Sequence, residues 1–328
     1  MRKTIVSAMA AGLLLSSLAA CGDSSSDSGT GSGAKDDGKI TLGFAQVGAE
    51  SGWRTANTDS VKKSAADAGI DLKFVDGQQK QEVQISAIRG FIQQKVDVIA
   101  FSPKVETGWD GVLKEAKDAG IPVILTDRAG DSDPSLYQTF LGSDFVVEGE
   151  RAGDWLVKEY QGKPGPVNVV ELQGTTGSAP AIDRKEGFGK VIAADPKFKI
   201  IASQTAEFTR AKGKEVMTSF LQSNPKIDVL YAHNDDMALG AIQAIEEAGK
   251  KPGTDIKIIT VDGIKDAFVA MAAKKINVIV ECNPLLGPQL MELTQKVAKK
   301  ETVEKRILTK EGVFTQDQAA AALPTRQY

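Results

Sequence analysis

The sequence is poor in the residues that most often build metal sites and disulfide frameworks. Its 328 residues contain one histidine, His233, and two cysteines, Cys21 and Cys282. No cysteine–histidine cluster therefore has metal-ligand spacing. If Cys21 is modified, Cys282 has no partner and the mature chain lacks an internal disulfide. We expect no metal and no cofactor.

The sequence also lacks an excess of positive charge. It has 40 lysines and arginines against 43 aspartates and glutamates, a net charge of −3, and the two signs are interspersed along the chain. Nucleic-acid-binding domains carry a clustered basic patch instead. We therefore expect no nucleic acid partner.

The apolar run near the N-terminus is too short for a membrane span. "MRK" gives a positive start, "TIVSAMAAGLLLSSLAA" an apolar core, and Cys21 follows small residues, which is typical of a secretory signal peptide over residues 1–20. The run "LAAC" resembles the lipobox of bacterial lipoproteins, which implies cleavage before Cys21 and a lipid on its sulfur. An ordinary signal peptide with a chance cysteine is the alternative. Residues 21–38 are rich in serine, glycine and aspartate, as in a flexible tether.

The remainder alternates between short β-branched runs and amphipathic helical segments. Ten runs, such as "KITLGFAQV" and "IKIITVDG", are mostly separated by segments such as "EVQISAIRGFIQQK". Strands buried on both faces and alternating with helices predict an α/β fold with parallel sheets. Ten strands exceed one comfortable sheet, and the short link "YQTFLGSD" breaks the alternation near the middle. The sequence therefore predicts two doubly wound lobes.

Charged and amide side chains collect directly after several of these runs, where open α/β sheets bind their ligands. Carboxylates, guanidiniums and amides make paired hydrogen bonds to vicinal hydroxyls, and an aromatic face covers the C–H side of a sugar ring. A nucleotide would call for glycines and a helix N-terminus instead. The residues at these positions are Glu50, Trp53, Arg54, Asp127, Arg128, Arg184, Asn234 and Asp262, with Glu281 and Asn283 near a later crossing.

Several motifs resemble those of a known family. "FAQVGAESGWR", "ILTDR", "APAIDRKEGF", "YAHNDDMALG" and "ITVDG" resemble the ribose-type (type I) periplasmic binding proteins of sugar ABC transporters, and within them the galactofuranose-binding branch. The resemblance implies two Rossmann-like lobes that close on a monosaccharide, galactofuranose or a related aldose, and deliver it to a membrane permease. It implies a monomeric binding protein outside the cytoplasm, not an enzyme. The anchoring to the cell membrane by lipid on Cys21, which the lipobox predicts, departs from the free periplasmic form of the family.

The resemblance also implies how the chain divides. Three hinge segments are expected near Gly142–Phe145, Val278–Asn283 and Arg306. The expected lobes comprise residues 39–143 plus 281–305, and residues 144–280 plus 306–328.

Carried over residue by residue, the resemblance implies eight sugar contacts. They are Glu50, Trp53, Arg54, Asp127, Arg128, Arg184, Asn234 and Asp262. These residues also have structural alternatives. Trp53 could cover the core at the start of a helix, and Asp127 and Arg128 could form a surface ion pair. Asp262 could be a turn residue or a helix cap. Asp235 and Asp236 are expected to cap the next helix rather than contact sugar.

Two other classes of protein use similar residues or the same fold. A glycosidase would use Glu50 with Asp127 or Asp262 as its carboxylate pair. Neighbouring arginines are expected to keep such acids ionised, which makes them poor proton donors. A sugar-responsive repressor would need an N-terminal helix-turn-helix, where this chain has an export signal. A role as the partner of a membrane chemoreceptor stays open. The sequence also leaves arabinose, galactose and galactofuranose as alternative ligands.

Overall fold

The computed structural model describes residues 38–328. The predicted signal peptide, the predicted lipid attachment at Cys21 and the predicted tether up to residue 37 lie outside the described residues. Among the helices that are described, none has both the length and the apolar character needed to cross a membrane.

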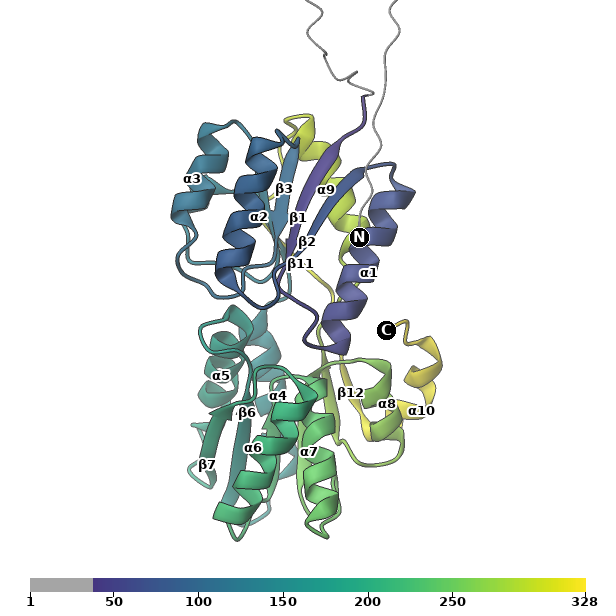
Figure 1. The fold of residues 1–328 in the computed structure, drawn as a ribbon. Helices are drawn as coiled ribbons and strands as arrows, with labels where there is room; N and C mark the ends of the chain where they lie inside the picture. The colour runs from purple at the N-terminus through teal and green to yellow at the C-terminus, as the bar shows by residue number, and fades with distance from the viewer. Residues whose placement is uncertain (1–37) are drawn as a thin grey trace, which may run out of the picture. The chain divides into compact units, whose positions relative to one another are not determined.

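The first lobe is built on a parallel sheet of six strands in the order β11-β5-β4-β3-β1-β2 (Figure 1). The strands are β1 (Thr41–Gln46), β2 (Asp71–Asp76), β3 (Val98–Phe101), β4 (Val123–Asp127), β5 (Thr139–Gly142) and β11 (Arg306–Leu308). The helices are α1 (Gly52–Asp67), α2 (Gln81–Gln93), α3 (Asp110–Asp118) and α9 (Gly287–Ala298), with a 3-10 turn at Pro134–Leu136. Every residue of β3 and β4 is buried, as expected of parallel strands covered on both faces.

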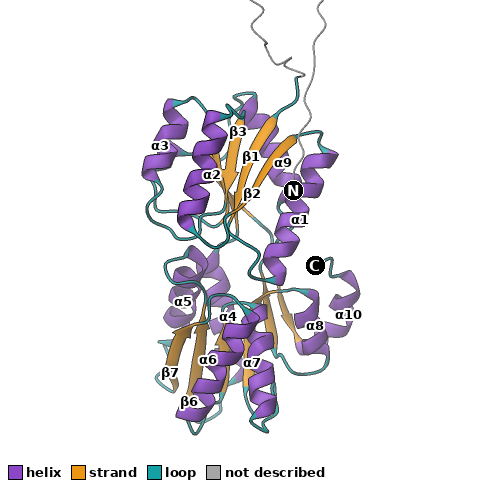
Figure 2. Cartoon of the chain, in the orientation of Figure 1, coloured by secondary structure: helices purple, strands orange, loops and turns teal. Residues whose placement is uncertain are grey.

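The second lobe has a sheet in the order β12-β10-β9-β8-β6-β7, parallel except for the edge strand β12. Without β11 and β12, the two sheets have the orders β5-β4-β3-β1-β2 and β10-β9-β8-β6-β7. Counted along the chain within each lobe, these two orders are the same. The strands are β6 (Val167–Gln173), β7 (Phe198–Thr205), β8 (Val229–Ala232), β9 (Lys257–Asp262), β10 (Val278–Glu281) and β12 (Val313–Thr315). The helices are α4 (Phe145–Glu159), α5 (Ala179–Ile192), α6 (Arg210–Ser223), α7 (Asp235–Glu247), α8 (Lys265–Ala272) and α10 (Ala319–Ala322), with 3-10 turns at Gln316–Gln318 and Leu323–Thr325 (Figure 2).

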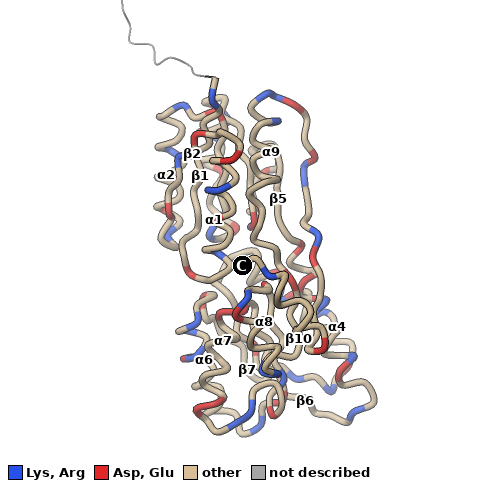
Figure 3. Tube along the Cα trace, turned by 90° about the vertical axis from the view of Figure 1, so that its right-hand side faces the viewer, with Lys and Arg blue, Asp and Glu red and all other residues tan. Residues whose placement is uncertain are grey.

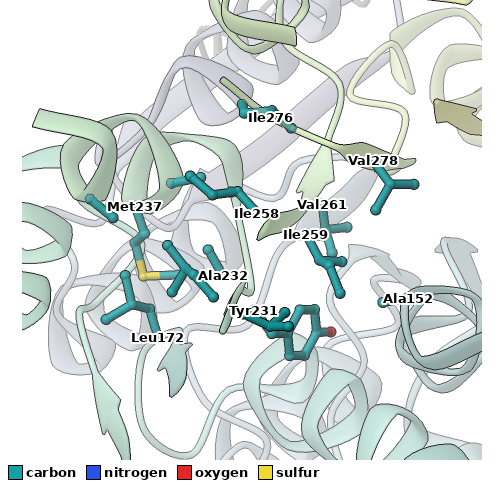
Figure 4. Close-up of a cluster of buried hydrophobic side chains, with 14 of the residues drawn as sticks. Ala152, Leu172, Tyr231, Ala232, Met237, Ile258, Ile259, Val261, Ile276 and Val278 are labelled. Carbon is teal, nitrogen blue, oxygen red and sulfur yellow. The ribbon is translucent and has the colours of Figure 1, made fainter. Parts of the chain in front are cut away.

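Each lobe has its own hydrophobic core against its sheet. In the first lobe, successive residues of β3 point to opposite faces, so that Val98 and Ala100 join one buried cluster and Ile99 and Phe101 the other. In the second lobe, side chains of neighbouring strands pack together beneath the helices (Figure 4). Lysines and arginines alternate with acidic residues along the outer segments of both lobes (Figure 3). The predicted α/β fold with two doubly wound lobes is confirmed.

The chain passes between the lobes three times. The first crossing, residues 143–144, joins β5 to α4, and the second, residues 282–286, joins β10 to α9. The third, residues 309–312, joins β11 to β12. Because β11 pairs with β5 in the first sheet, this crossing lies a few residues later than the expected boundary at Arg306, and residues 306–308 belong to the first lobe.

Candidate functional site

The cavity between the lobes brings together all eight residues that the sequence predicts as sugar contacts. The predicted residues that line it are Glu50, Trp53, Arg54, Asp127, Arg128, Arg184, Asn234 and Asp262. It lies where the carboxyl ends of the strands of both sheets face each other, which is the usual ligand position in open α/β sheets.

The first half of the cavity is formed where β1 leads into α1. Ser51 caps α1, because its hydroxyl accepts a hydrogen bond from the Arg54 amide at 3.1 Å. One turn of helix then brings the Arg54 guanidinium to the Glu50 carboxylate, with 3.1 Å between Nε and Oε1. Its NH1 donates to Asp127 Oδ2 at 2.7 Å. The sequence "ESGWR" is therefore a helix start that holds a buried guanidinium between two carboxylates.

Asp127 and Arg128 both reach the cavity because the chain leaves the sheet at the end of β4. Asp127 has a φ of 63°, in the left-handed region, and the Arg128 amide donates to the Thr126 carbonyl at 2.7 Å in a tight turn. This turn overcomes the alternation that points neighbouring strand residues apart. The Arg128 guanidinium lies 3.6 Å from Glu50 Oε1 and 5.3 Å from the ring centre of Phe208 in the second lobe. Asp127 and Arg128 are thus buried partners in a network, not a surface ion pair.

Burial and charge control ionisation in this half. Burial, together with repulsion from Arg54, lowers the pKa of Arg128 to about 10. Burial acts on Arg54 in the same direction, but the charges of Asp127 and Glu50 outweigh it and raise the pKa of Arg54 above its usual value. Both arginines are therefore cationic hydrogen-bond donors at neutral pH.

The second half of the cavity centres on Arg184 of α5. Its Nε donates to Glu148 Oε2 at 2.7 Å, its NH1 donates to the His233 carbonyl at 2.5 Å, and its NH2 lies 3.7 Å from Asp262 Oδ1. Asp262 ends β9 with a φ of 120°, which is strongly unfavourable for a residue with a side chain. Burial raises the pKa of Asp262 well above its ordinary range, even though Arg184 opposes the shift.

Asn234 caps α7, where the sequence predicts Asp235 and Asp236 as caps. Its Oδ1 accepts from the Met237 amide at 3.0 Å, and its Nδ2 donates to the Phe208 carbonyl at 3.2 Å. The prediction of the capping aspartates is wrong, because Asn234 is the residue that still has extended backbone after β8. Asn234 therefore both caps the helix and lines the cavity.

The two aspartates of the first turn of α7 have other roles. Asp235 Oδ2 accepts from the amides of Gly263 and Ile264 at 2.7 and 2.8 Å, so it shapes the loop that follows Asp262. Asp236 Oδ2 accepts from the amide of Gly52, the first residue of α1, at 2.7 Å. Asp236 therefore joins the second lobe to the first.

Trp53 also joins the two lobes. Its helix belongs to the first lobe, but its side chain is 4% exposed and packs with the core of the second. The indole N–H donates to the carbonyl of Cys282, in the second crossing, at 2.7 Å. Elsewhere, the amide of Glu106 in the first lobe donates to the Gly177 carbonyl of the second lobe at 2.9 Å. The lobes are in contact around the cavity, which is a closed arrangement.

Sequence reasoning missed five residues that line the cavity: Ser51, Phe145, Pro180, Phe208 and Cys282. Phe145 and Phe208 follow β5 and β7, so the rule that singles out strand ends would have found them had it been extended to apolar side chains. Glu281 lies outside the cavity and pairs with Arg326 at 2.7 Å. His233 is fully buried, with Nε2 3.1 Å from Glu171, consistent with a structural residue.

Comparison with known proteins agrees with this architecture. The family described as periplasmic binding protein domain matches residues 42–302. The chain is 52% identical to the galactofuranose-binding protein YtfQ of Escherichia coli K12, over 88% of this chain and 92% of that protein. A crystal structure of a Mycobacterium smegmatis protein in complex with β-D-fucofuranose is 63% identical, with a TM-score of 0.87 over 88% of this chain and 95% of that one.

A further solved structure is the binding protein of the arabinose ABC transporter from Shewanella sp. ANA-3, bound to L-arabinofuranose. It is 51% identical, with a TM-score of 0.84 over 88% of this chain and 96% of that one. The chain therefore belongs to the periplasmic binding proteins. The relatives named here are a galactofuranose-binding protein and two proteins solved with fucofuranose and arabinofuranose, so the predicted family is confirmed.

Proposed function

We propose that this protein is the sugar-binding component of an ABC transporter and that it holds a monosaccharide in the furanose form, galactofuranose or a related aldose. The observation that carries this proposal is the cavity, in which three buried arginines, two aspartates, a glutamate and an amide converge beside aromatic side chains. The three relatives described above, which bind galactofuranose, fucofuranose and arabinofuranose, support the furanose form. The closed protein would then deliver the sugar to a membrane permease.

The polar groups of the cavity suit a ligand with several hydroxyls. Among the described residues, no protein partner reaches the buried Glu50 Oε2 or Arg128 Nε within hydrogen-bond distance. Buried polar atoms without a partner cost about 1–3 kcal/mol each. A sugar hydroxyl both donates and accepts, so a single hydroxyl can serve a carboxylate and a guanidinium together. In this proposal Trp53 and Phe208 cover the C–H faces of the ring.

We further propose that the protein acts by binding alone and is not an enzyme. Glu50 and Asp127 both accept hydrogen bonds from Arg54, and Asp262 lies 3.7 Å from Arg184, so each carboxylate of the predicted pairs already faces a guanidinium. A glycosidase needs instead a carboxyl group that is free to protonate the glycosidic oxygen. A chromogenic glycoside should therefore remain uncleaved in the presence of the purified protein.

A panel of sugars provides the direct test. We expect D-galactose, D-fucose or L-arabinose, whose solutions contain furanose forms, to raise the melting temperature. Sugar at a hundred times its dissociation constant stabilises the folded protein by about 2.7 kcal/mol. For a chain of this size that corresponds to a shift of roughly 5–10 °C. D-Ribose, D-fructose and the open-chain polyol mannitol serve as comparisons, and the absence of a shift with every sugar would overturn the proposal.

We also propose that lipid on Cys21 anchors the protein outside the cytoplasm, at the cell membrane. Two acyl chains and a short tether would give stable attachment while leaving the lobes free to reach a permease. We expect labelled fatty acid to enter the wild-type protein during expression and Cys21→Ala to remain unlabelled. Cys282→Ala is the matched control and should label like the wild type. Equal labelling of wild type and Cys21→Ala would contradict the anchor.

A further inference from the structure

The three crossings between the lobes meet in one partly buried cluster of polar side chains. Ser143 lies in the first crossing, Cys282 in the second and Glu311 in the third. Glu311 Oε1 accepts from the Ser143 hydroxyl at 2.5 Å and from the backbone amide of Asn283 at 2.9 Å. Ser143 Oγ also lies 3.4 Å from the Cys282 sulfur. One carboxylate thus ties together the three segments about which the lobes would move.

Glu148 lies between this cluster and the sugar cavity. It is in the first turn of α4, directly after the first crossing, and its side chain is fully buried. Its Oε2 accepts from Arg184 Nε at 2.7 Å. The carboxylates of Glu148 and Glu311 and the thiol of Cys282 lie within 4.8 Å of one another. A cation in this cluster is disfavoured, because Arg184 already brings a positive charge to the same carboxylate.

We propose that Glu148 is a positioning residue that orients Arg184 toward the sugar. We also propose that protonation of its carboxyl group makes sugar affinity depend on pH. This inference rests on the proposed sugar-binding function. It adds a residue that does not line the cavity, since Glu148 acts through Arg184.

The charges around Glu148 determine the direction of the pH effect. Burial raises the pKa of Glu148 to about 8, Glu311 adds to the shift, and Arg184 opposes it. The other titratable groups that face it are Cys282, whose pKa burial raises well above its usual value, and Asp262 and Tyr231, both of which are influenced by the Glu148 charge.

Below this pH the carboxyl is protonated, and the Arg184 guanidinium bonds to a neutral acceptor. Above it, the carboxylate and the guanidinium form a hydrogen-bonded ion pair, which holds Arg184 more strongly. Affinity should therefore rise with pH, and by linkage sugar binding should release protons near pH 8.

The test compares Glu148→Gln with the wild type, using D-fucose, or L-arabinose if that sugar gave the larger melting shift. Glutamine keeps the shape and the acceptor of the protonated acid but does not titrate. We expect similar dissociation constants for both proteins at pH 6.5, and at pH 9 roughly threefold to tenfold weaker binding by the variant. Calorimetry in two buffers of different ionisation enthalpy should show that the wild type releases more protons than the variant at pH 8.

Glu150→Gln is the matched control. Glu150 also connects α4 to α5, through Lys190 at 2.7 Å, but on the solvent side of the helices. It should bind like the wild type at both pH values. The dissociation constants of Glu148→Gln and the wild type are compared as a ratio at each pH. If this ratio does not change with pH, the inference is overturned. If Glu148→Gln does not fold, the absence of proton release by the wild type overturns it. A wild type that binds no sugar overturns the proposed function, and the inference with it.

Discussion

Asp262→Gly is expected to lose sugar affinity by roughly tenfold to a hundredfold while the unliganded protein melts at or above the wild-type temperature. The carboxyl group of Asp262 lines the cavity, and the loss of a buried hydrogen-bond partner costs about 1–3 kcal/mol of binding energy. The backbone at this residue has a φ of 120°, where a side chain costs about 1–3 kcal/mol and glycine is relaxed. The greater freedom of glycine in the unfolded chain offsets about 1 kcal/mol of this gain.

Calorimetric titration and thermal melts of the unliganded proteins measure the two effects separately. Lys274→Gly is the matched control, because Lys274 is exposed, has a φ of 62° and precedes the amino end of β10, whereas the cavity lies at the carboxyl ends of the strands. It should gain stability and keep its affinity. If Asp262→Gly binds sugar like the wild type, Asp262 is a strained turn residue and not a sugar contact. If it loses binding together with several degrees of melting temperature, its role is structural.

Asp236→Ala is expected to weaken sugar binding about tenfold and to enlarge the unliganded protein in solution. Sequence reasoning alone predicts the opposite, a loss of stability with affinity spared, because it treats Asp236 as a helix cap. In the structure the Asp236 carboxylate accepts from the Gly52 amide of the other lobe at 2.7 Å, so it stabilises the closed arrangement. A charge-assisted bond of this kind contributes about 1.5–3 kcal/mol, available only when the lobes are together.

The measurements are titration calorimetry and the radius of gyration from small-angle scattering, with and without sugar. Asp266→Ala is the control, because Asp266 shares the partner Arg210 at 3.1 Å but is largely exposed and makes no bond to the first lobe. It should match the wild type in affinity and size. An Asp236→Ala protein with unchanged affinity and a lower melting temperature would restore the simpler explanation, in which the residue stabilises only its own helix.

The positions at strand ends were the most informative part of the sequence. A parallel sheet forces the carboxyl ends of its strands to one edge, so residues as distant as Glu50 and Asp262 are expected to meet once two such sheets face each other. That expectation depends on topology alone, and all eight predicted residues line one cavity. Their binding of sugar remains a proposal.

The sequence could not show which residues connect the lobes. Asn234, Asp235 and Asp236 are all of types that cap helices, and the end of β8 decides which of them does so. The bond from Gly52 to Asp236 joins residues of different lobes and depends on how the lobes are placed. No local pattern encodes such a contact, because neither residue is unusual for its own helix.

The sequence also could not show the position of the third crossing. The strand β11 has only three residues, "RIL", and lies at the edge of its sheet, so its hydrophobic pattern is too short to distinguish it from a loop. Its pairing with β5 assigns residues 306–308 to the first lobe. Glu311, which bonds to all three crossings, acquires that position only as a result.

The matching strand orders of the two lobes have a consequence for how the cavity distinguishes ligand orientations. They make β4 equivalent to β9, and each ends in an aspartate with positive φ that lines the common cavity. By strand order alone, the two lobes would present similar, symmetric halves to the ligand. A monosaccharide has no such symmetry, so the two halves can select one orientation of it only where they have diverged. One divergence is the next residue along the chain, Arg128 after Asp127 but Gly263 after Asp262.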